Sequence, residues 1–218
     1  MLIGEDFVFL HIPKTGGTFV QRVLVEHMSH VETGLYTHTP YSEVPAHARA
    51  LPGFYVVRNP WDWYVSWFHW SSQRGRELGR NAGPIRSDRK RFVWENMLRR
   101  GEADFEEAVR RACSGEFDHP TLPTLGADLY SASVTGIAGE ALERPDFAAL
   151  RFEGLRKQLR GYIRGHAGVD RELLAAIRNA PPARTSEHAG YRQYYDDALR
   201  GLVGERTAWI CERFGYRF

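Results

Sequence analysis

The chain has 218 residues, 43% of them hydrophobic and 13% aromatic, a composition that excludes a disordered protein and suffices for one sizeable core. Its 29 basic and 27 acidic residues give a net charge of +2, which argues against a general nucleic-acid or membrane-surface binder. No apolar stretch approaches the ~20 residues that a membrane span needs. Glu5 and Asp6 interrupt any signal-peptide pattern, and Cys113 and Cys211 lack metal-ligand spacing. We therefore expect a single, metal-free cytoplasmic domain over residues 1–218.

The first seventy residues alternate between short apolar runs and helical patterns. Phe7–Leu10 is a continuous apolar run, typical of a parallel strand covered on both faces. The following segment predicts an amphipathic helix, because its apolar residues recur at helical spacing: Phe19, Val20, Val23, Leu24 and Met28. Between them lies His11-Ile12-Pro13-Lys14-Thr15-Gly16-Gly17-Thr18. A strand, a glycine-bearing loop with one lysine and then a helix predict an anion site, because backbone N–H groups and the helix N-terminus can converge on one oxyanion.

The spacing of the lysine and the glycines indicates which class of phosphate-binding loop this is. A nucleoside-triphosphatase loop reads G-x-x-x-x-G-K-[ST], but here Lys14 precedes the glycine pair and no G-K-[ST] occurs. The string resembles instead the 5′-phosphosulfate-binding loop of sulfotransferases that use 3′-phosphoadenosine-5′-phosphosulfate (PAPS). The resemblance implies that Lys14 is catalytic and contacts the bridging oxygen of the donor. It also implies that the loop residues bind the 5′-phosphate and the sulfuryl group: Lys14, Thr15, Gly16, Gly17 and Thr18.

A second motif strengthens the resemblance. Phe54–Val57 predicts a buried strand that ends in Arg58, and Pro60 suits the first turn of a helix. In the sulfotransferase family, a strand-end arginine and a serine eight residues later bind the 3′-phosphate, and Arg58 and Ser66 match that spacing. An arginine fork is suited to bidentate phosphate binding. The helix after Pro60 carries four tryptophans, which favour packing over adenine stacking.

The rest of the chain is assigned from patterns. Residues 73–91 are rich in Gly and Arg and predict a loop. Residues 71–147 as a whole do not resemble the sulfotransferase family, and we expect them to form a variable acceptor or lid region. Helices are predicted over Asp104–Cys113, from Asp170 to just before Pro181, and over Asp196–Phe214 with Gly215 as its C-cap; Ala148–Phe152 predicts a strand. The alternation predicts an α/β fold with a central parallel sheet and helices on both sides, a three-layer sandwich. The C-terminal tail resembles bacterial carbohydrate-type sulfotransferases.

The catalytic base is one of nine histidines or a glutamate. His38, in Thr37-His38-Thr39-Pro40, is favoured because a histidine suits proton removal at neutral pH and because the string resembles the setting of the family's histidine base. His11 and Glu43 remain alternatives. The resemblance also suggests that Arg184 and Ser186 complete the 3′-phosphate site.

Taken together, the motifs imply a P-loop-like sulfotransferase that moves a sulfuryl group from PAPS to an acceptor hydroxyl, releases 3′-phosphoadenosine-5′-phosphate (PAP) and needs no metal. A carbohydrate-type acceptor is favoured, and the oligomeric state stays open. Two alternatives remain: a P-loop kinase that requires magnesium, and a non-catalytic nucleotide- or glycan-binding module.

Overall fold

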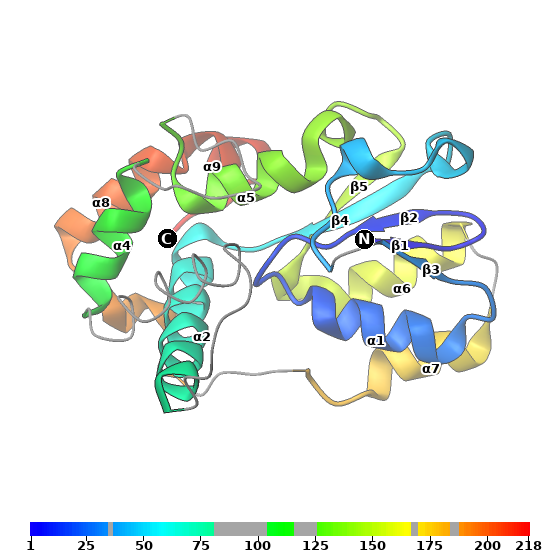
Figure 1. Ribbon diagram of the computed structural model, residues 1–218, viewed down its shortest axis with the longest axis horizontal. Coiled ribbons are helices and arrows are strands. Elements are labelled where there is room, and N and C mark those ends of the chain that lie inside the picture. The colour runs from blue at the N-terminus through cyan, green and yellow to red at the C-terminus, as the bar shows by residue number, and fades with distance from the viewer. Residues whose placement is uncertain (35–36, 81–103, 116–125, 167–169, 184–187) are drawn as a thin grey trace. The chain divides into compact units, whose positions relative to one another are not determined.

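The computed structural model describes residues 1–34, 37–80, 104–115, 126–166, 170–183 and 188–218 (Figure 1). These residues form two compact units. The first contains residues 1–58 and 133–185, and the second contains residues 59–132 and 186–218. The expected single-domain organisation stays a prediction.

The first unit is built on a mixed sheet. Its described strands are β1 (Leu2–Ile3), β2 (Val8–Leu10), β3 (Glu32–Thr33), β4 (Gly53–Val57) and β5 (Phe147–Arg151), in the order β3-β1-β2-β4-β5. Strands β2, β4 and β5 are parallel, with Phe9 opposite Phe54 and Phe54 opposite Ala148. Strand β1 pairs antiparallel with both β2 and β3. The parallel centre of the sheet is as expected, and the antiparallel edge was not predicted.

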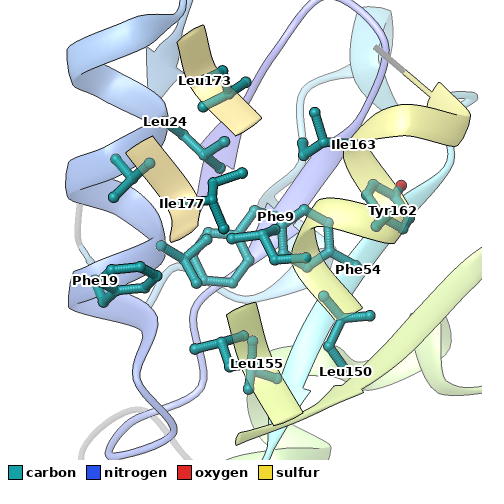
Figure 2. Close-up of a cluster of buried hydrophobic side chains, with 14 of the residues drawn as sticks. Phe9, Phe19, Leu24, Phe54, Leu150, Leu155, Tyr162, Ile163, Leu173 and Ile177 are labelled. Carbon is teal, nitrogen blue, oxygen red and sulfur yellow. The ribbon is translucent and has the colours of Figure 1, made fainter. Parts of the chain in front are cut away.

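Three helices cover one face of this sheet, namely α1 (Gly17–His27), α6 (Leu155–His166) and α7 (Arg171–Asn179), as Figure 1 shows. Alternate strand residues face them, so Phe9, Phe54 and Leu150 enter one cluster with Leu24 and Ile163 (Figure 2). Phe9 and Phe54 stack with ring centroids 4.9 Å apart. This core fixes the positions of the three parallel strands and therefore of the loops that leave their carboxyl ends.

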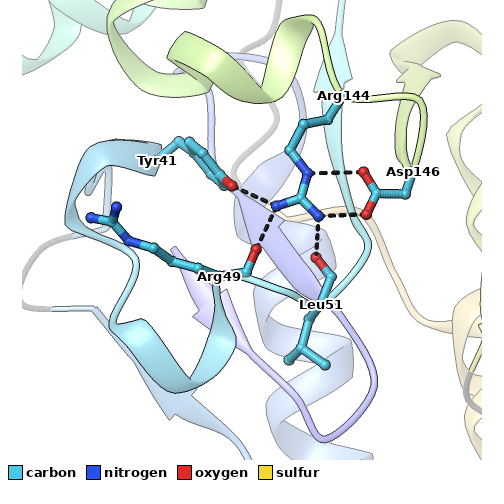
Figure 3. A network of polar contacts seen from close by, with 5 residues as sticks. All are labelled: Tyr41, Arg49, Leu51, Arg144 and Asp146. Atoms are coloured by element: carbon cyan, nitrogen blue, oxygen red, sulfur yellow. Dashed lines mark hydrogen bonds and ion pairs between the residues drawn. The ribbon is translucent and has the colours of Figure 1, made fainter.

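Short 3-10 helices belong to the same unit: η1 (Tyr41–Glu43), η2 (Ala46–Ala48), η3 (Gly139–Leu142) and η4 (Phe152–Gly154). Arg144 joins the segment before β4 to the start of β5 (Figure 3). Its guanidinium donates to the Tyr41 hydroxyl, to the carbonyls of Arg49 and Leu51, and to the Asp146 carboxylate. The guanidinium lowers the pKa of Asp146 through these hydrogen bonds.

The second unit contains helices α2 (Pro60–Arg80), α4 (Phe105–Cys113), α8 (Asp197–Arg206) and α9 (Ala208–Phe214), with the 3-10 turn η5 (Tyr191–Tyr194). Helix α5 (Leu129–Ala138) begins in this unit and ends in the first. Helix α2 packs against α4, α8 and η5. Its Trp61, Trp63 and Trp67 are buried, and Trp63 stacks on Tyr130 at 4.6 Å, so the packing role predicted for these tryptophans is confirmed.

Most predicted elements are present, with two corrections. Asp104 and Asp170, at the predicted starts of two helices, are the N-caps of α4 and α7, and Gly215 is the left-handed C-cap of α9 as expected. The loop predicted for residues 73–91 is wrong for residues 73–80, which continue α2; Gln, Arg, Glu and Leu there favour a helix more than the two glycines oppose it. Residues 81–91 lie outside the described residues. The predicted last helix is two helices, because it breaks at Thr207, whose hydroxyl donates to the Val203 carbonyl.

Candidate functional site

The predicted anion loop follows β2 and leads directly into α1. Gly16 is the N-cap of α1 and adopts a left-handed conformation with φ of 85°. Lys14 also has a positive φ of 63°, and within the described residues it is the only non-glycine residue that does. Alternating left-handed residues before a helix N-terminus are typical of a loop that turns its N–H groups toward an anion. The strand, loop and helix predicted from the sequence are therefore present.

The two loop glycines are required by the packing of the protein itself. A Cβ on Gly17 would lie 2.0 Å from Cδ2 of His11, and a Cβ on Gly16 would lie 3.0 Å from both Leu155 and Phe152. In the structure, the space beside them is filled by side chains of the first unit.

Thr15 and Thr18 differ in their surroundings. The Thr15 side chain is fully buried, and its hydroxyl donates to the carbonyl of Ile12 at 2.8 Å. Thr15 therefore stiffens the loop from inside. Thr18 is half-buried in the first turn of α1.

Arg58 leaves the end of β4 and holds the loop. It is buried, with 7% of its surface exposed, and donates from Nη1 to the carbonyl of Lys14 at 3.1 Å. Its guanidinium lies 4.1 Å from the centroid of the Phe152 ring, a cation–π contact. Phe152 follows β5 directly, so residues from the carboxyl ends of all three parallel strands meet here. The sequence pattern places Phe152 only at the end of a strand, and its role as the support of Arg58 was not predicted.

His38 lies beside the same loop. Its Nδ1 is 2.8 Å from the carbonyl oxygen of His11, and its ring makes an edge contact with the His11 ring, with centroids 4.6 Å apart. His38 is exposed, yet the protein atoms around its imidazole reduce its hydration enough to lower its pKa below 6.5. The positive charges of Lys14 and of the Met1 amino group lower the pKa further, against the opposing effect of the hydrogen bond to His11. The imidazole is therefore neutral at neutral pH and can accept a proton.

Of the remaining predicted residues, His11 adjoins the same loop and His38, and the others lie elsewhere. The alternative base His11 is buried, with 3% of its surface exposed, and stacks on Phe9; Glu43 is exposed in η1. Ser66 is buried on α2 in the second unit. Arg184 and Ser186 lie outside the described residues. The first unit thus brings together Lys14, the glycine loop, Arg58 and His38.

Two properties of the described residues bear on partners and cofactors. In the ranges that the structure describes, no three His, Cys, Asp or Glu side chains lie close enough together to hold a metal ion. No helix in the same ranges has the length and apolar character needed to cross a membrane.

Comparison with known proteins identifies the fold class. No protein-family model and no curated protein sequence matches the chain. The structure is similar to that of mouse sulfotransferase SULT7A1 complexed with PAP, with a TM-score of 0.55 at 15% sequence identity. The match covers 94% of this chain and 86% of that chain. The expected fold class is thereby confirmed: the chain has the α/β fold of the sulfotransferases.

Proposed function

We propose that this protein is a PAPS-dependent sulfotransferase that transfers a sulfuryl group to an acceptor hydroxyl. One observation carries the proposal: a cationic loop, an arginine and a neutral histidine meet at the carboxyl edge of β2, β4 and β5. Lys14 and Arg58 supply positive charge there, and His38 supplies a base. The PAP bound to the structural neighbour supports the same ligand chemistry.

Lys14 and Arg58 suit an anionic donor. In the proposed site, Lys14 and the N–H groups of the loop contact the 5′-phosphate and the sulfuryl group, and Arg58 contacts the 3′-phosphate. The bound donor supplies a sulfuryl group linked through oxygen to its 5′-phosphate. Lys14 would offset the negative charge that grows on this bridging oxygen as its bond to sulfur breaks.

His38 would act as the general base. As the acceptor oxygen forms its bond to sulfur, His38 takes the hydroxyl proton on Nε2, because its Nδ1 already carries a hydrogen that it donates to His11. The sulfated acceptor and PAP leave, and the proton passes from His38 to solvent. His38 and Lys14, the two residues assigned to this transfer, both belong to the first unit.

The finer parts of the proposal rest on the sequence motifs. We assign Ser66, Arg184 and Ser186 to the 3′-phosphate, and a carbohydrate or glycosylated small molecule as the acceptor, as in the bacterial carbohydrate-type branch. The two cysteines, Cys113 and Cys211, are free thiols, which fits a reducing cytoplasm.

Isothermal titration with PAP, 5′-AMP and magnesium–ATP tests the donor site. We expect PAP to bind at micromolar concentration without metal and 5′-AMP to bind much more weakly, because it lacks the 3′-phosphate. Lys14→Ala should weaken PAP binding, and Lys157→Ala, which removes an exposed lysine of α6, should not. A preference for magnesium–ATP would favour a kinase. PAP binding without turnover of labelled PAPS across a panel of sugar and phenol acceptors would favour a binding module.

A further inference from the structure

His11 has two neighbours that the proposed chemistry needs. On one side its imidazole fills the space that a side chain on Gly17 would occupy, with Cδ2 only 2.0 Å from the position of a Cβ. On the other side the ring contacts the His38 ring, with centroids 4.6 Å apart and an interplanar angle of 70°. Phe9 stacks on His11 at 5.7 Å, so the ring is held within the core of the first unit.

The backbone of His11 acts on His38 as well. A carbonyl oxygen can only accept, so the 2.8 Å contact with His38 Nδ1 requires a hydrogen on that nitrogen. Neutral His38 is then the tautomer whose Nε2 has a lone pair. Both the ring and the carbonyl of one buried residue therefore act on the candidate base.

We infer that His11 is a positioning residue that links the anion loop to the base. Its ring, held between Gly17 and His38, sets the orientation of the His38 imidazole, and its carbonyl selects the tautomer with Nε2 as proton acceptor. The catalytic meaning of this link rests on the proposed function. The link itself is a property of the free protein and is tested there.

The link predicts how His38 responds to substitutions. His11→Ala removes the ring that shields one side of His38, so water reaches that side of the imidazole as well. The pKa of His38 should then rise toward the ordinary value of about 6.5, while the tautomer should persist, because alanine keeps the backbone carbonyl. The charged groups that act on His38 are Lys14 and the Met1 amino group, and both remain in this variant. His11→Phe keeps an aromatic ring in place and should keep most of the wild-type pKa.

The decisive experiment combines Gly17→Ala with His11→Ala. The Cβ that Gly17→Ala introduces would collide with the His11 ring, to which its three nearest atoms all belong. This substitution should therefore displace the ring and raise the pKa of His38, which is 21 residues away in sequence. In the His11→Ala background the same substitution meets no ring, and it should leave His38 unchanged. Such loss of effect in a double-mutant cycle is the signature of a relay through His11.

The measurement is NMR of the imidazole nitrogens during a pH titration of the free protein, with His38 assigned by the signal lost in His38→Gln. Val23→Ala, a fully buried position in α1, is the control for destabilisation and should lower the melting temperature without changing the pKa of His38. The inference is overturned if Gly17→Ala leaves His38 unchanged in the wild-type background, or changes it equally in both backgrounds. Failure of PAP binding would overturn the proposed function and leave this result intact.

Discussion

The support of Arg58 by Phe152 gives a sharp test of the proposed donor site. We predict that Phe152→Leu weakens PAP binding, although Phe152 has no assigned contact with the donor. The leucine keeps apolar volume after β5 but removes the ring that lies 4.1 Å from the Arg58 guanidinium. Without this ring, the Arg58 guanidinium loses its cation–π contact and keeps its hydrogen bond to the Lys14 carbonyl.

The magnitude follows from burial. Arg58 is 7% exposed, so its cation–π contact is largely desolvated and contributes about 2 kcal/mol. The ring atoms lost from half-buried Phe152 cost about 1 kcal/mol more in burial. If Arg58 is displaced, its charge-assisted hydrogen bond to the 3′-phosphate, which contributes about 1.5–3 kcal/mol, is largely lost. We therefore expect urea unfolding to show a loss of about 2–3 kcal/mol, and titration calorimetry to show PAP affinity reduced about tenfold, because 1.4 kcal/mol is a factor of ten.

Phe147→Leu is the matched control. Phe147 is the first residue of β5, and its ring lies 5.0 Å from the Arg144 guanidinium, away from the anion loop. Because Phe147 is buried, this variant should lose about 2 kcal/mol of stability and bind PAP as the wild type does. Unchanged PAP affinity in Phe152→Leu, or equal weakening in both variants, would refute the role given to Arg58.

Three further predictions address stability, charge and pH. Arg144→Ala should lower the free energy of unfolding in urea by about 2 kcal/mol. Asp146→Ala should lower it by less than about 1 kcal/mol, because the Arg144 guanidinium still donates to the carbonyls of Arg49 and Leu51. Equal losses in the two variants would contradict this role of Arg144. Lys14→Ala should reduce turnover of labelled PAPS by about 100-fold or more without lowering stability, and Lys157→Ala should change neither; a full rate in Lys14→Ala would exclude its catalytic role. The turnover rate should rise with pH through a midpoint below 6.5 and be flat above neutrality, since the lowered pKa leaves His38 unprotonated there; a midpoint above neutrality would count against His38 as the base.

Local patterns were enough to predict most of the fold. The apolar runs of β2 and β4, the helical spacing of α1, and the capping residues Asp104 and Asp170 are each encoded by a few neighbouring residues. Strands β1 and β3 have two residues each, which is too short for an alternation pattern to be seen.

The break between α8 and α9 illustrates a different limit. The apolar stripe runs on from Leu199 and Val203 to Ile210, all three of them buried, so the sequence predicts one continuous helix. The helix is interrupted because Thr207 bonds back to the Val203 carbonyl at 2.7 Å and takes a φ of −105°. Threonine does not break every helix in which it occurs, so its effect here depends on the local packing.

The candidate site was predictable as a list of residues but not as a set of contacts. Arg58 directly follows β4, and Lys14 lies in the loop between β2 and α1; both positions can be read from the sequence. The hydrogen bond from His38 to His11 spans 27 residues, and Arg58 meets Phe152 only because β4 and β5 are adjacent and parallel. Contacts of this kind depend on strand order, which no local pattern records.

The residues of the loop differ in how strongly they indicate anion binding. Gly16 needs a left-handed backbone, and Gly17 needs to clear His11, so the fold alone accounts for both glycines. Lys14 is different, because its positive φ costs a residue with a Cβ about 1–2 kcal/mol that glycine would not incur. A positive charge just before the N-terminus of α1 is what an anion-binding loop needs, so Lys14 is stronger evidence for the proposed donor site than the two glycines.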